Sequence, residues 1–455
     1  MTDASISTPK VGPAKGGQSR KASMASFFGG ALEYYDFALF AAAAAIVFPT
    51  VFFGDGAAAT VGSLATFGVA YLARPIGAIV TGHIGDRVGR KQALMLTLIL
   101  MGVSTFLIGC LPTFEQAGML APILLVLLRL LQGFSAGGEL AGGSSLSVEH
   151  APEGRRGFFS SWTITGIGAG MLLSNLVMIP VAALPDEALY TWGWRIPFWA
   201  SIAVFAIGYF IRRRLEEPEV FEEIKQEKRT AGVPLFEAFR LNWQGIIRVA
   251  FANLFTVLNT VTNVFGIAYA ISVGVDRTTM VLVAALAQVL GLIFRPVGGL
   301  LTDRFGRKPI FILGVLGSGV MIFAYFASIQ AGNVPMIFIV NAIMTGVFLS
   351  LSDGVYPAFF AEMFSAKVRY TGMAVGLQVG LLVAGFAPSI GSTLTKGDAN
   401  NWLPIAIFTC VCSVLAAIAA LTAKETFRTP LRDVGITPQI RRQQESQKMR
   451  ESASV

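Results

Sequence analysis

Long apolar runs dominate this chain. Of its 455 residues, 54% are hydrophobic and 14% are charged, whereas an average soluble chain carries about 25% charged residues. Each run has about 20 residues or more, enough for a helix to cross a hydrocarbon core of roughly 30 Å at about 1.5 Å per residue. Twelve runs occur, at about 24–52, 60–83, 92–111, 118–148, 157–184, 195–211, 245–274, 278–301, 309–330, 335–363, 370–395 and 402–423.

The twelve runs fall into two sets of six, separated by a charged stretch from Arg212 to about Asn242. The sequence therefore predicts an all-α membrane protein with twelve transmembrane helices in two six-helix bundles. The expected parts are a disordered tail (1–23), an N-terminal bundle (24–211), a linker (212–244), a C-terminal bundle (245–423) and a second tail (424–455).

The positions of the basic residues predict how the chain is oriented. With the N-terminus in the cytoplasm, 29 of the 35 Lys and Arg residues fall in cytoplasmic segments or at their span edges, and three fall outside. Loops rich in Lys and Arg remain in the cytoplasm. We therefore expect both tails and the linker to be cytoplasmic, in a multi-pass protein of the inner (cytoplasmic) membrane. This distribution explains the net charge of +8 without a nucleic-acid partner.

A ten-residue motif occurs once in each half. Gly82–Lys91 reads Gly-His-Ile-Gly-Asp-Arg-Val-Gly-Arg-Lys, and Gly299–Lys308 reads Gly-Leu-Leu-Thr-Asp-Arg-Phe-Gly-Arg-Lys. Other pairs recur in the same order: Arg-Pro before each motif, and Glu with Arg seven residues later after the fourth and tenth runs. The two halves are therefore expected to be pseudo-symmetric copies of one unit.

The motif Gly-x-x-x-Asp-Arg-x-Gly-Arg-Lys between two membrane helices resembles the loop signature of the major facilitator superfamily of transporters. Further segments resemble its metabolite:proton symporter family, which includes shikimate, α-ketoglutarate, citrate and proline/betaine carriers. The resemblance runs from about Ser26 to Phe427 and implies transport by alternating access. The segments are Glu33–Phe37, Arg129–Glu139, Glu149–Pro152, Arg156–Gly157, Trp194–Phe198, Glu217–Phe221 and Arg369–Gly372.

Three charged residues are predicted to couple transport to protons. A charge at mid-bilayer costs about 2.5–3.5 kcal/mol on insertion scales, so each needs a partner, a cavity or a role. Glu33 and Asp36 share a helix face, and by residue count they lie near the membrane centre, as does Arg129. We predict that Asp36, with Glu33, takes up the proton, and that Arg129 sets its proton affinity. The alternative is a permanent ion pair that joins the first and fourth helices.

Polar residues within the apolar runs are predicted to bind the substrate. Arg129, Gln132 and Glu139 lie within an arc of roughly 80° at about 100° per residue, so they should line a cavity. An arginine can hold a carboxylate through two parallel hydrogen bonds; pairing with the protein's own acids is the alternative. The predicted residues are Tyr35, Arg74, Arg129, Gln132, Glu139, Asn259, Asn263, Tyr269, Arg295, Asp353, Tyr356 and Gln378.

Charged residues at the cytoplasmic helix ends are predicted to form a gate. Such a network would break and form again during transport, and would favour the inward-facing or the outward-facing state. The alternative is that these charges only set the topology. The predicted gating residues are Asp86, Arg87, Arg90, Glu149, Arg156, Asp303, Arg304, Arg307, Glu362 and Arg369.

The predicted function is a secondary active transporter that imports a small organic acid with protons, such as shikimate or a di- or tricarboxylate. The alternatives are proton-coupled uptake of a zwitterion such as proline or betaine, export by proton antiport, and a non-transporting nutrient sensor. No nucleophile–base or metal set stands out, and the three cysteines fall in apolar runs, so we expect no enzyme activity, cofactor or metal. The expected partners are the substrate, protons and the bilayer, and a monomer is expected.

Overall fold

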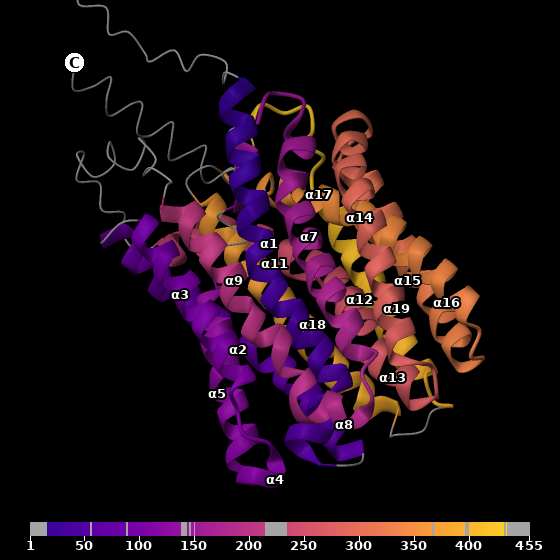
Figure 1. The fold of residues 1–455 in the computed structure, drawn as a ribbon. Coiled ribbons are helices and arrows are strands. Elements are labelled where there is room, and N and C mark those ends of the chain that lie inside the picture. The colour runs from indigo at the N-terminus through magenta and orange to yellow at the C-terminus, as the bar shows by residue number, and fades with distance from the viewer. Residues whose placement is uncertain are drawn as a thin grey trace, which may run out of the picture.

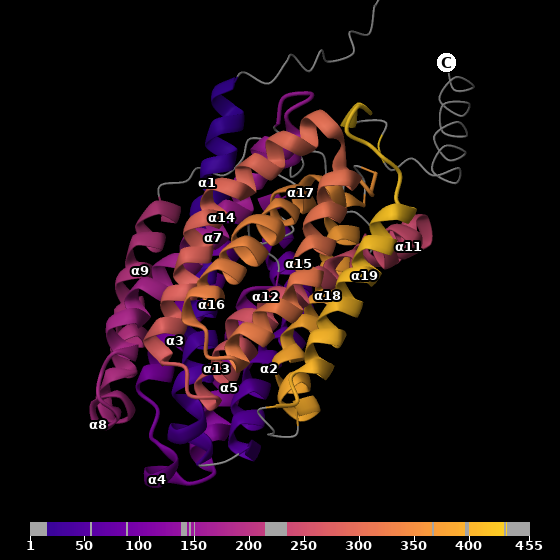
Figure 2. The same ribbon diagram turned by 90° about the vertical axis from the view of Figure 1, so that its right-hand side faces the viewer.

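The computed structural model describes residues 16–54, 57–87, 90–137, 143–144, 147–149, 151–213, 234–365, 368–395, 400–431 and 434. Every regular element in these segments is helical, and the long helices run side by side (Figures 1 and 2). We call the end where α1 begins and α19 ends the termini end. The opposite end, with α4 and α8, is the far end.

Six long helices form the N-terminal half: α1 (Gly16–Ile46), α2 (Ala57–Arg87), α3 (Arg90–Gly109), α5 (Leu120–Ser135), α7 (Arg156–Ala182) and α9 (Arg195–Arg213). Short elements join them at the far end: η1 (Pro49–Phe53), α4 (Phe114–Ala117), α8 (Asp186–Ala188) and η2 (Leu189–Gly193).

The C-terminal half repeats this plan with two interrupted spans. Its elements are α11 (Pro234–Ala252), η3 (Asn253–Phe255), α12 (Thr256–Thr260), η4 (Val261–Phe265), α13 (Gly266–Ser272), α14 (Arg277–Phe305), α15 (Arg307–Gln330), α16 (Val334–Asn341), η5 (Ala342–Leu349), α17 (Ser350–Ala361), α18 (Arg369–Thr395) and α19 (Leu403–Thr422). The η4 and η5 segments are π-helical, a local widening that often occurs at functional sites.

The helices have the length and apolarity that membrane spans require. Within the described segments, eight are long and apolar enough to cross a bilayer, and two shorter apolar helices cover Met95–Gly109 and Leu120–Ser135. With α1 and α9 these make the twelve spans that the apolar runs predict. The exposed large hydrophobic side chains, such as Ile79, Val320 and Leu421, are suited to face lipid.

Two boundaries differ from the expected ones. The first helix, α1, begins at Gly16, so residues 16–23 are helical rather than disordered. The Ser23 hydroxyl donates to the carbonyl of Phe159, and packing against α7 supports this polar turn. The chain also enters a helix, α11, at Pro234, inside the expected linker.

A backbone break at Asn242 separates the first turns of α11 from the membrane span. Asn242 has non-helical angles (φ −150°, ψ 43°), and its side-chain oxygen accepts from the backbone N–H of Gly245. This is the geometry of a helix N-cap, which satisfies a backbone donor at the start of the span. The side-chain amide also donates to the Met363 carbonyl, so it ties this span to the end of α17.

The two halves meet mainly along two helix pairs, α7 with α14 and α2 with α18. Within the N-terminal half, α2 and α5 approach closely because glycine lies between them: a Cβ on Gly133 would stand 1.9 Å from the Ala70 carbonyl oxygen. Small residues allow such close helix packing in membranes. The same helix pairs leave a cavity between the halves.

Candidate functional site

A central cavity of about 100 Å³ lies between the two halves, and its walls differ in character. The N-terminal half contributes mainly aromatic and apolar side chains, including Tyr34, Phe37, Phe67, Tyr71 and Met171. The C-terminal half contributes the larger polar set: Asn253, Thr256, Asn259, Thr260, Asn263, Gln288, Arg295, Asp353 and Tyr356. One wall is therefore suited to an apolar surface and the other to hydrogen-bonding groups.

Arg295 organises the polar wall. Its Nε lies 3.1 Å from Asp353 Oδ2, and its Nη2 donates to Gln288 Oε1 at 3.0 Å. Its third nitrogen, Nη1, is buried and has no hydrogen-bond partner among the described residues. Nη1 lies against Gly168 of α7, where a Cβ would stand 1.9 Å away. The guanidinium thus spans the interface between the halves and retains donor capacity.

On the opposite wall, Arg74 connects a buried acid to the cavity lining. Its Nη2 lies 3.7 Å from Glu33 Oε1, and its guanidinium lies close to the Tyr34 side chain. Its guanidinium carbon lies 4.3 Å from the ring centre of Phe37 and 4.6 Å from that of Tyr71, within cation–π range. Arg74 itself does not appear in the cavity lining, but Tyr34, Phe37 and Tyr71 do.

Asp36 and Arg129 lie near each other, but the contacts of the Arg129 guanidinium go to other side chains. Arg129 donates to Gln132 Oε1 at 3.0 Å, Gln132 Nε2 donates to Thr105 Oγ1 at 2.7 Å, and the Thr105 hydroxyl donates to the Met101 carbonyl at 2.9 Å. Among the described side chains, no ion pair within 4 Å joins Asp36 to Arg129. Gln132 receives the guanidinium because it follows Arg129 by three residues on the same helix face.

Several other predicted substrate-binding residues lie away from the central cavity. Tyr35 donates to the Pro197 carbonyl at 3.4 Å and so faces α9, and Gln378 donates to the Gly137 carbonyl at 3.0 Å. Tyr269 stacks on Phe265, with ring centres 5.8 Å apart. Arg129 and Gln132 are buried within the N-terminal bundle, and Glu139 lies outside the described residues. The cavity brings together Asn259, Asn263, Arg295, Asp353 and Tyr356.

Sequence reasoning missed other residues of the cavity, notably Tyr34, Tyr71 and Gln288. The sequence could have indicated Gln288, since it is a polar residue in an apolar run, two helical turns before Arg295 on the same face. Tyr34 and Tyr71 had none, because a tyrosine in a membrane helix packs as readily as it binds.

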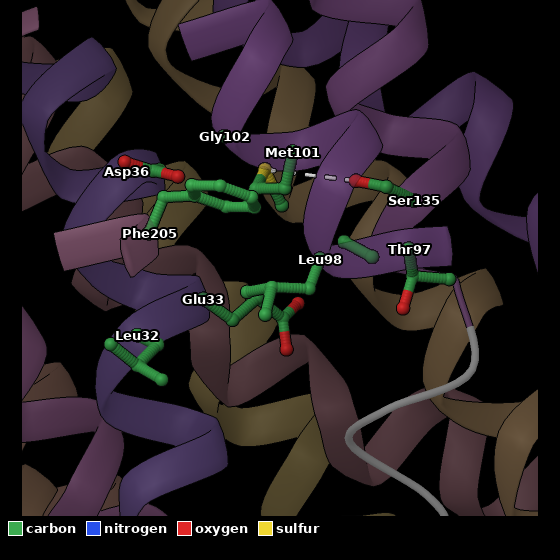
Figure 3. A pocket seen from close by; sticks show the side chains of 10 residues that line it. Leu32, Glu33, Asp36, Thr97, Leu98, Met101, Gly102, Ser135 and Phe205 are labelled. Atoms are coloured by element: carbon green, nitrogen blue, oxygen red, sulfur yellow. Dashed lines mark hydrogen bonds between the residues drawn. The ribbon is translucent and has the colours of Figure 1, made fainter. Parts of the chain in front are cut away.

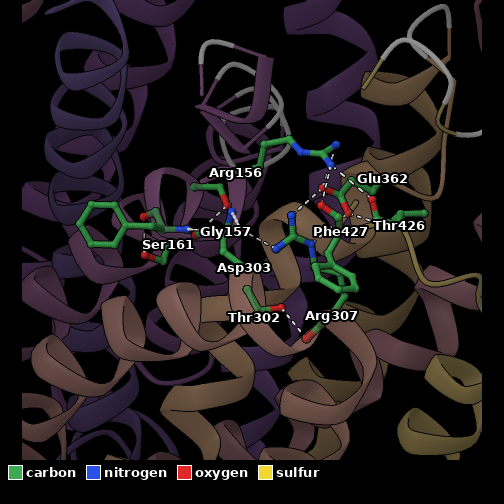
Figure 4. A network of polar contacts seen from close by, with 12 residues as sticks. Arg156, Gly157, Ser161, Thr302, Asp303, Arg307, Glu362, Thr426 and Phe427 are labelled. Carbon is green, nitrogen blue, oxygen red and sulfur yellow. Dashed lines mark hydrogen bonds and ion pairs between the residues drawn. The ribbon is translucent and has the colours of Figure 1, made fainter. Parts of the chain in front are cut away.

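At the termini end, an ion-pair network closes the space between the halves (Figure 4). Arg156 of the N-terminal half lies 3.1 Å from Glu362 of the C-terminal half. Arg307 lies 2.9 Å from Glu362 and 2.7 Å from Asp303. The Asp303 carboxylate also accepts from the backbone N–H groups of Gly157 and Phe158, so it sits at the positive end of the α7 dipole.

The recurring Glu and Arg pairs are exchanged between the halves. Arg156 pairs with Glu362, while Arg369 Nη1 lies 3.2 Å from Glu149 Oε1. Each arginine thus reaches the acid of the other repeat rather than the one seven residues before it, so the pairs resist separation of the two halves. Arg304 lies over the Phe305 ring instead. The predicted gating side chains Asp86, Arg87 and Arg90 lie outside the described side chains.

The segment after α19 joins this network. Arg156 Nη2 donates to the carbonyls of Thr426, Phe427 and Thr429, and the Thr426 hydroxyl donates to Glu362. Glu425 accepts from the backbone N–H groups of Arg307 and Lys308, at 2.9 and 3.0 Å. Its carboxylate therefore caps the start of α15.

Replacing Glu425 by Ala is expected to lower stability by about 0.5–2 kcal/mol, because α15 loses its cap. The measurement is the thermal unfolding midpoint of purified protein in detergent. Lys424→Ala, a change at the neighbouring exposed position, is the control and should leave the midpoint unchanged. Equal midpoints for the two variants would show that the cap contributes no stability.

Replacing Glu362 by Gln is expected to open the termini end. The change keeps the shape but leaves Arg156 and Arg307 without their shared counter-charge, and breaking a buried pair costs roughly 3–5 kcal/mol. A cysteine placed at Ser161, which lies beside Gly299 between the halves, should then react faster with an impermeant thiol reagent. Cys110, Cys410 and Cys412 are replaced first.

The control for Glu362→Gln is Asp186→Asn at the far end. There Arg277 donates to the carbonyls of Ala182 and Leu184 and to Asp186. The Asp186 side chain is 72% exposed, and exposed pairs contribute about 0–1 kcal/mol. Labelling at position 161 that rises equally in both variants would mean that the buried network does not hold the termini end closed.

Two pseudo-symmetric six-helix halves with a cavity between them are the architecture of a membrane transporter. The sequence matches the family described as Major Facilitator Superfamily over residues 26–273 and 249–448. The chain therefore belongs to the major facilitator superfamily, a family of transporters rather than enzymes. The solved proton:xylose symporter XylE, bound to 6-bromo-6-deoxy-D-glucose, has a TM-score of 0.71 at 19% identity, covering 92% of this chain and 98% of that one. At this identity the match shows the fold, and it confirms the predicted architecture.

Similar proteins indicate to which family within the superfamily the chain belongs. The shikimate transporter of Escherichia coli (strain K12) is 36% identical, covering 94% of this chain and 100% of that protein. The proline/betaine transporter of the same strain is 33% identical, covering 93% and 86%. These similarities confirm the resemblance to the metabolite:proton symporter family that the sequence motifs indicate.

Proposed function

We propose that this protein is a proton-coupled symporter that imports a small organic acid across the inner membrane. The observation that carries the proposal is Arg295, a buried guanidinium that lines the cavity between the halves and has an unpaired Nη1. We further propose that the termini end faces the cytoplasm, as the basic residues predict, and that the protein acts as a monomer.

The two walls of the cavity together offer contacts for each part of a small hydroxylated carboxylic acid. Its carboxylate would accept hydrogen bonds from Arg295, because a guanidinium offers donors in a fork that matches carboxylate oxygens. Its hydroxyl groups would bond to the amides of Asn259 and Asn263. Its carbon skeleton would pack on the aromatic wall formed by Tyr34, Phe37 and Tyr71. The similarity to the shikimate transporter favours a substrate of this kind.

Proton coupling is assigned to Asp36 and Glu33, both of which are 6% exposed. Asp36 Oδ1 has no hydrogen-bond partner among the described residues, so its carboxyl group is free to bind a proton. Glu33 reaches the substrate cavity through Arg74 and Tyr34. Protonation of Glu33 would weaken its hold on Arg74 and so alter the cavity wall, which gives the proton an influence on substrate binding.

Uptake of a zwitterion such as proline or betaine is the second candidate. A specific feature favours it: the aromatic rings of Phe37, Phe67 and Tyr71 line the cavity with Asp353. Aromatic faces and a carboxylate recognise quaternary ammonium groups. The proline/betaine relative supports this candidate as well.

The test is uptake into proteoliposomes under an inward proton gradient, with radiolabelled shikimate, dicarboxylates, citrate, proline and betaine. The expected result is concentrative uptake of one organic acid that a protonophore abolishes. Uptake of proline or betaine alone would support the second candidate. If none is accumulated by folded protein that binds one of the acids, import driven by protons is refuted.

A further inference from the structure

A second cavity lies inside the N-terminal bundle, between α1, α3, the end of α5 and α9 (Figure 3). We call it the side cavity. Its polar lining consists of Glu33, Asp36, Thr97 and Ser135, and its apolar lining includes Met101, Gly102 and Phe205. It offers about 20 Å³ to the centre of a water molecule, and about 10–15 Å³ with two to four polar partners is enough to hold one water.

Both of the acids assigned to proton coupling line the side cavity, and neither lines the central cavity. In contrast, their neighbours on α1, Tyr34, Phe37 and Ala38, line the central cavity. Helix α1 therefore presents acids to one cavity and aromatic side chains to the other. The proton-binding groups and the substrate site lie on different faces of the same helix.

Arg74 stands between the two cavities. It is 1% exposed, contacts Glu33 on the side-cavity face, and contacts Tyr34 and Tyr71 on the central face. A buried cation at this point opposes passage of a proton from one cavity to the other. Protons therefore need a route to the acids that does not pass the substrate.

The surroundings of the acids support this separation. The charged and titratable groups that lie near them are Arg74 from α2, Arg129 from α5 and Tyr356 from α17, in addition to Tyr34 and Tyr35 on α1. The side chains that α3 and α9 contribute to the side cavity carry no charge.

Helices α1 and α3 both begin at the termini end (Figure 1); Leu32 and Glu33 come before Asp36 on α1, and Thr97 and Leu98 come before Met101 and Gly102 on α3. Thr97 and Glu33 therefore belong to the part of the side cavity nearest the termini end, and Asp36 to the part farther from it.

We propose that the side cavity is the route by which the coupling proton leaves Asp36 and Glu33 toward the termini end, separately from the substrate. A water molecule held by Thr97 and Ser135 would accept the proton from the carboxyl group, and the acid would become a carboxylate again. This inference rests on the proposed function, since it concerns the proton that drives uptake.

The test is Gly102→Ala, with Gly109→Ala as the matched control. Both glycines lie on α3 and pack against aromatic residues of α9: a Cβ on Gly102 would stand 2.6 Å from Phe205, and one on Gly109 2.9 Å from Phe198. Of the two, Gly102 lines the side cavity. A methyl group there must displace the Phe205 ring, which forms part of the same lining.

Two readouts are compared in proteoliposomes: proton-driven uptake, which requires the proton to be released, and substrate counterflow, which does not. Gly102→Ala is expected to slow proton-driven uptake by roughly tenfold, a barrier change of about 1.4 kcal/mol, with unchanged counterflow and substrate affinity. Gly109→Ala is expected to leave the ratio of the two rates as in the unmodified protein. Thr97→Val, which keeps the volume and removes a hydroxyl, should lower this ratio in the same direction.

The outcomes separate this proposal from the proposed function. If the unmodified protein shows no proton-driven accumulation, the proposed function fails. If it accumulates substrate but Gly102→Ala and Gly109→Ala lower both rates to the same degree, the side cavity is a packing feature and the route is refuted. An unchanged ratio in Thr97→Val, where little strain is introduced, would refute it even if Gly102→Ala does not fold.

Discussion

Asp36→Asn is expected to abolish proton-driven accumulation of the substrate while leaving counterflow intact. The amide has the shape of the carboxyl group but cannot bind and release a proton at neutral pH. Asp36 makes no ion pair within 4 Å among the described side chains, so the change should not destabilise the protein. The measurement is radiolabelled uptake in proteoliposomes with and without an inward proton gradient.

Asp353→Asn is the informative comparison for that experiment. Asp353 is also a buried acid, but it lines the central cavity and holds Arg295 at 3.1 Å. Its replacement should disturb the substrate site, so that counterflow and accumulation fall together. Retained accumulation in Asp36→Asn would remove Asp36 from the coupling mechanism and leave Glu33 as the candidate.

Gly168→Ala is expected to weaken substrate binding by at least about tenfold, or roughly 1.4 kcal/mol. The added methyl group would stand 1.9 Å from Arg295 Nη1. Since Arg295 is also held by Asp353 and Gln288, it can move only by giving up part of that polar wall. The measurement is the concentration dependence of counterflow, together with the thermal unfolding midpoint.

A double-mutant cycle tests whether Gly168 acts through the guanidinium. Arg295→Lys removes the planar fork and relieves the contact, so it should itself weaken binding. In this background the further change Gly168→Ala should cost little, because two residues in contact give non-additive effects. Additive losses would show that Gly168 affects transport by another path, such as the packing of α7 on α14.

The architecture could be read from the sequence because it follows from local patterns. A run of about 20 apolar residues is a membrane helix wherever it occurs, and the repeat of the Gly82–Lys91 motif at Gly299–Lys308 shows that six helices were duplicated. The extension of α1 to Gly16 was not readable, because a polar Ser-rich turn becomes helical here through its contact with α7.

The candidate site was readable in part, at the level of residue type. Polar residues that an apolar run would not otherwise contain, such as Asn259, Asn263 and Arg295, do line the cavity. The sequence predicts Tyr35 as a binding residue, whereas its neighbour Tyr34 lines the cavity. A shift of one residue turns a side chain by about 100° around the helix. The face that meets the other half depends on how the bundle packs.

The amino-acid sequence alone was sufficient for the twelve spans, the duplication, and the rule that buried charges must have partners or roles, since each depends on the cost of placing polar groups in hydrocarbon. The tertiary structure was needed to assign those partners. Arg156 binds the acid of the other repeat, Arg129 donates to Gln132, and Arg74 divides two cavities. The partner of a buried charge depends on how helices that are distant in sequence approach each other, and no local sequence pattern indicates that approach.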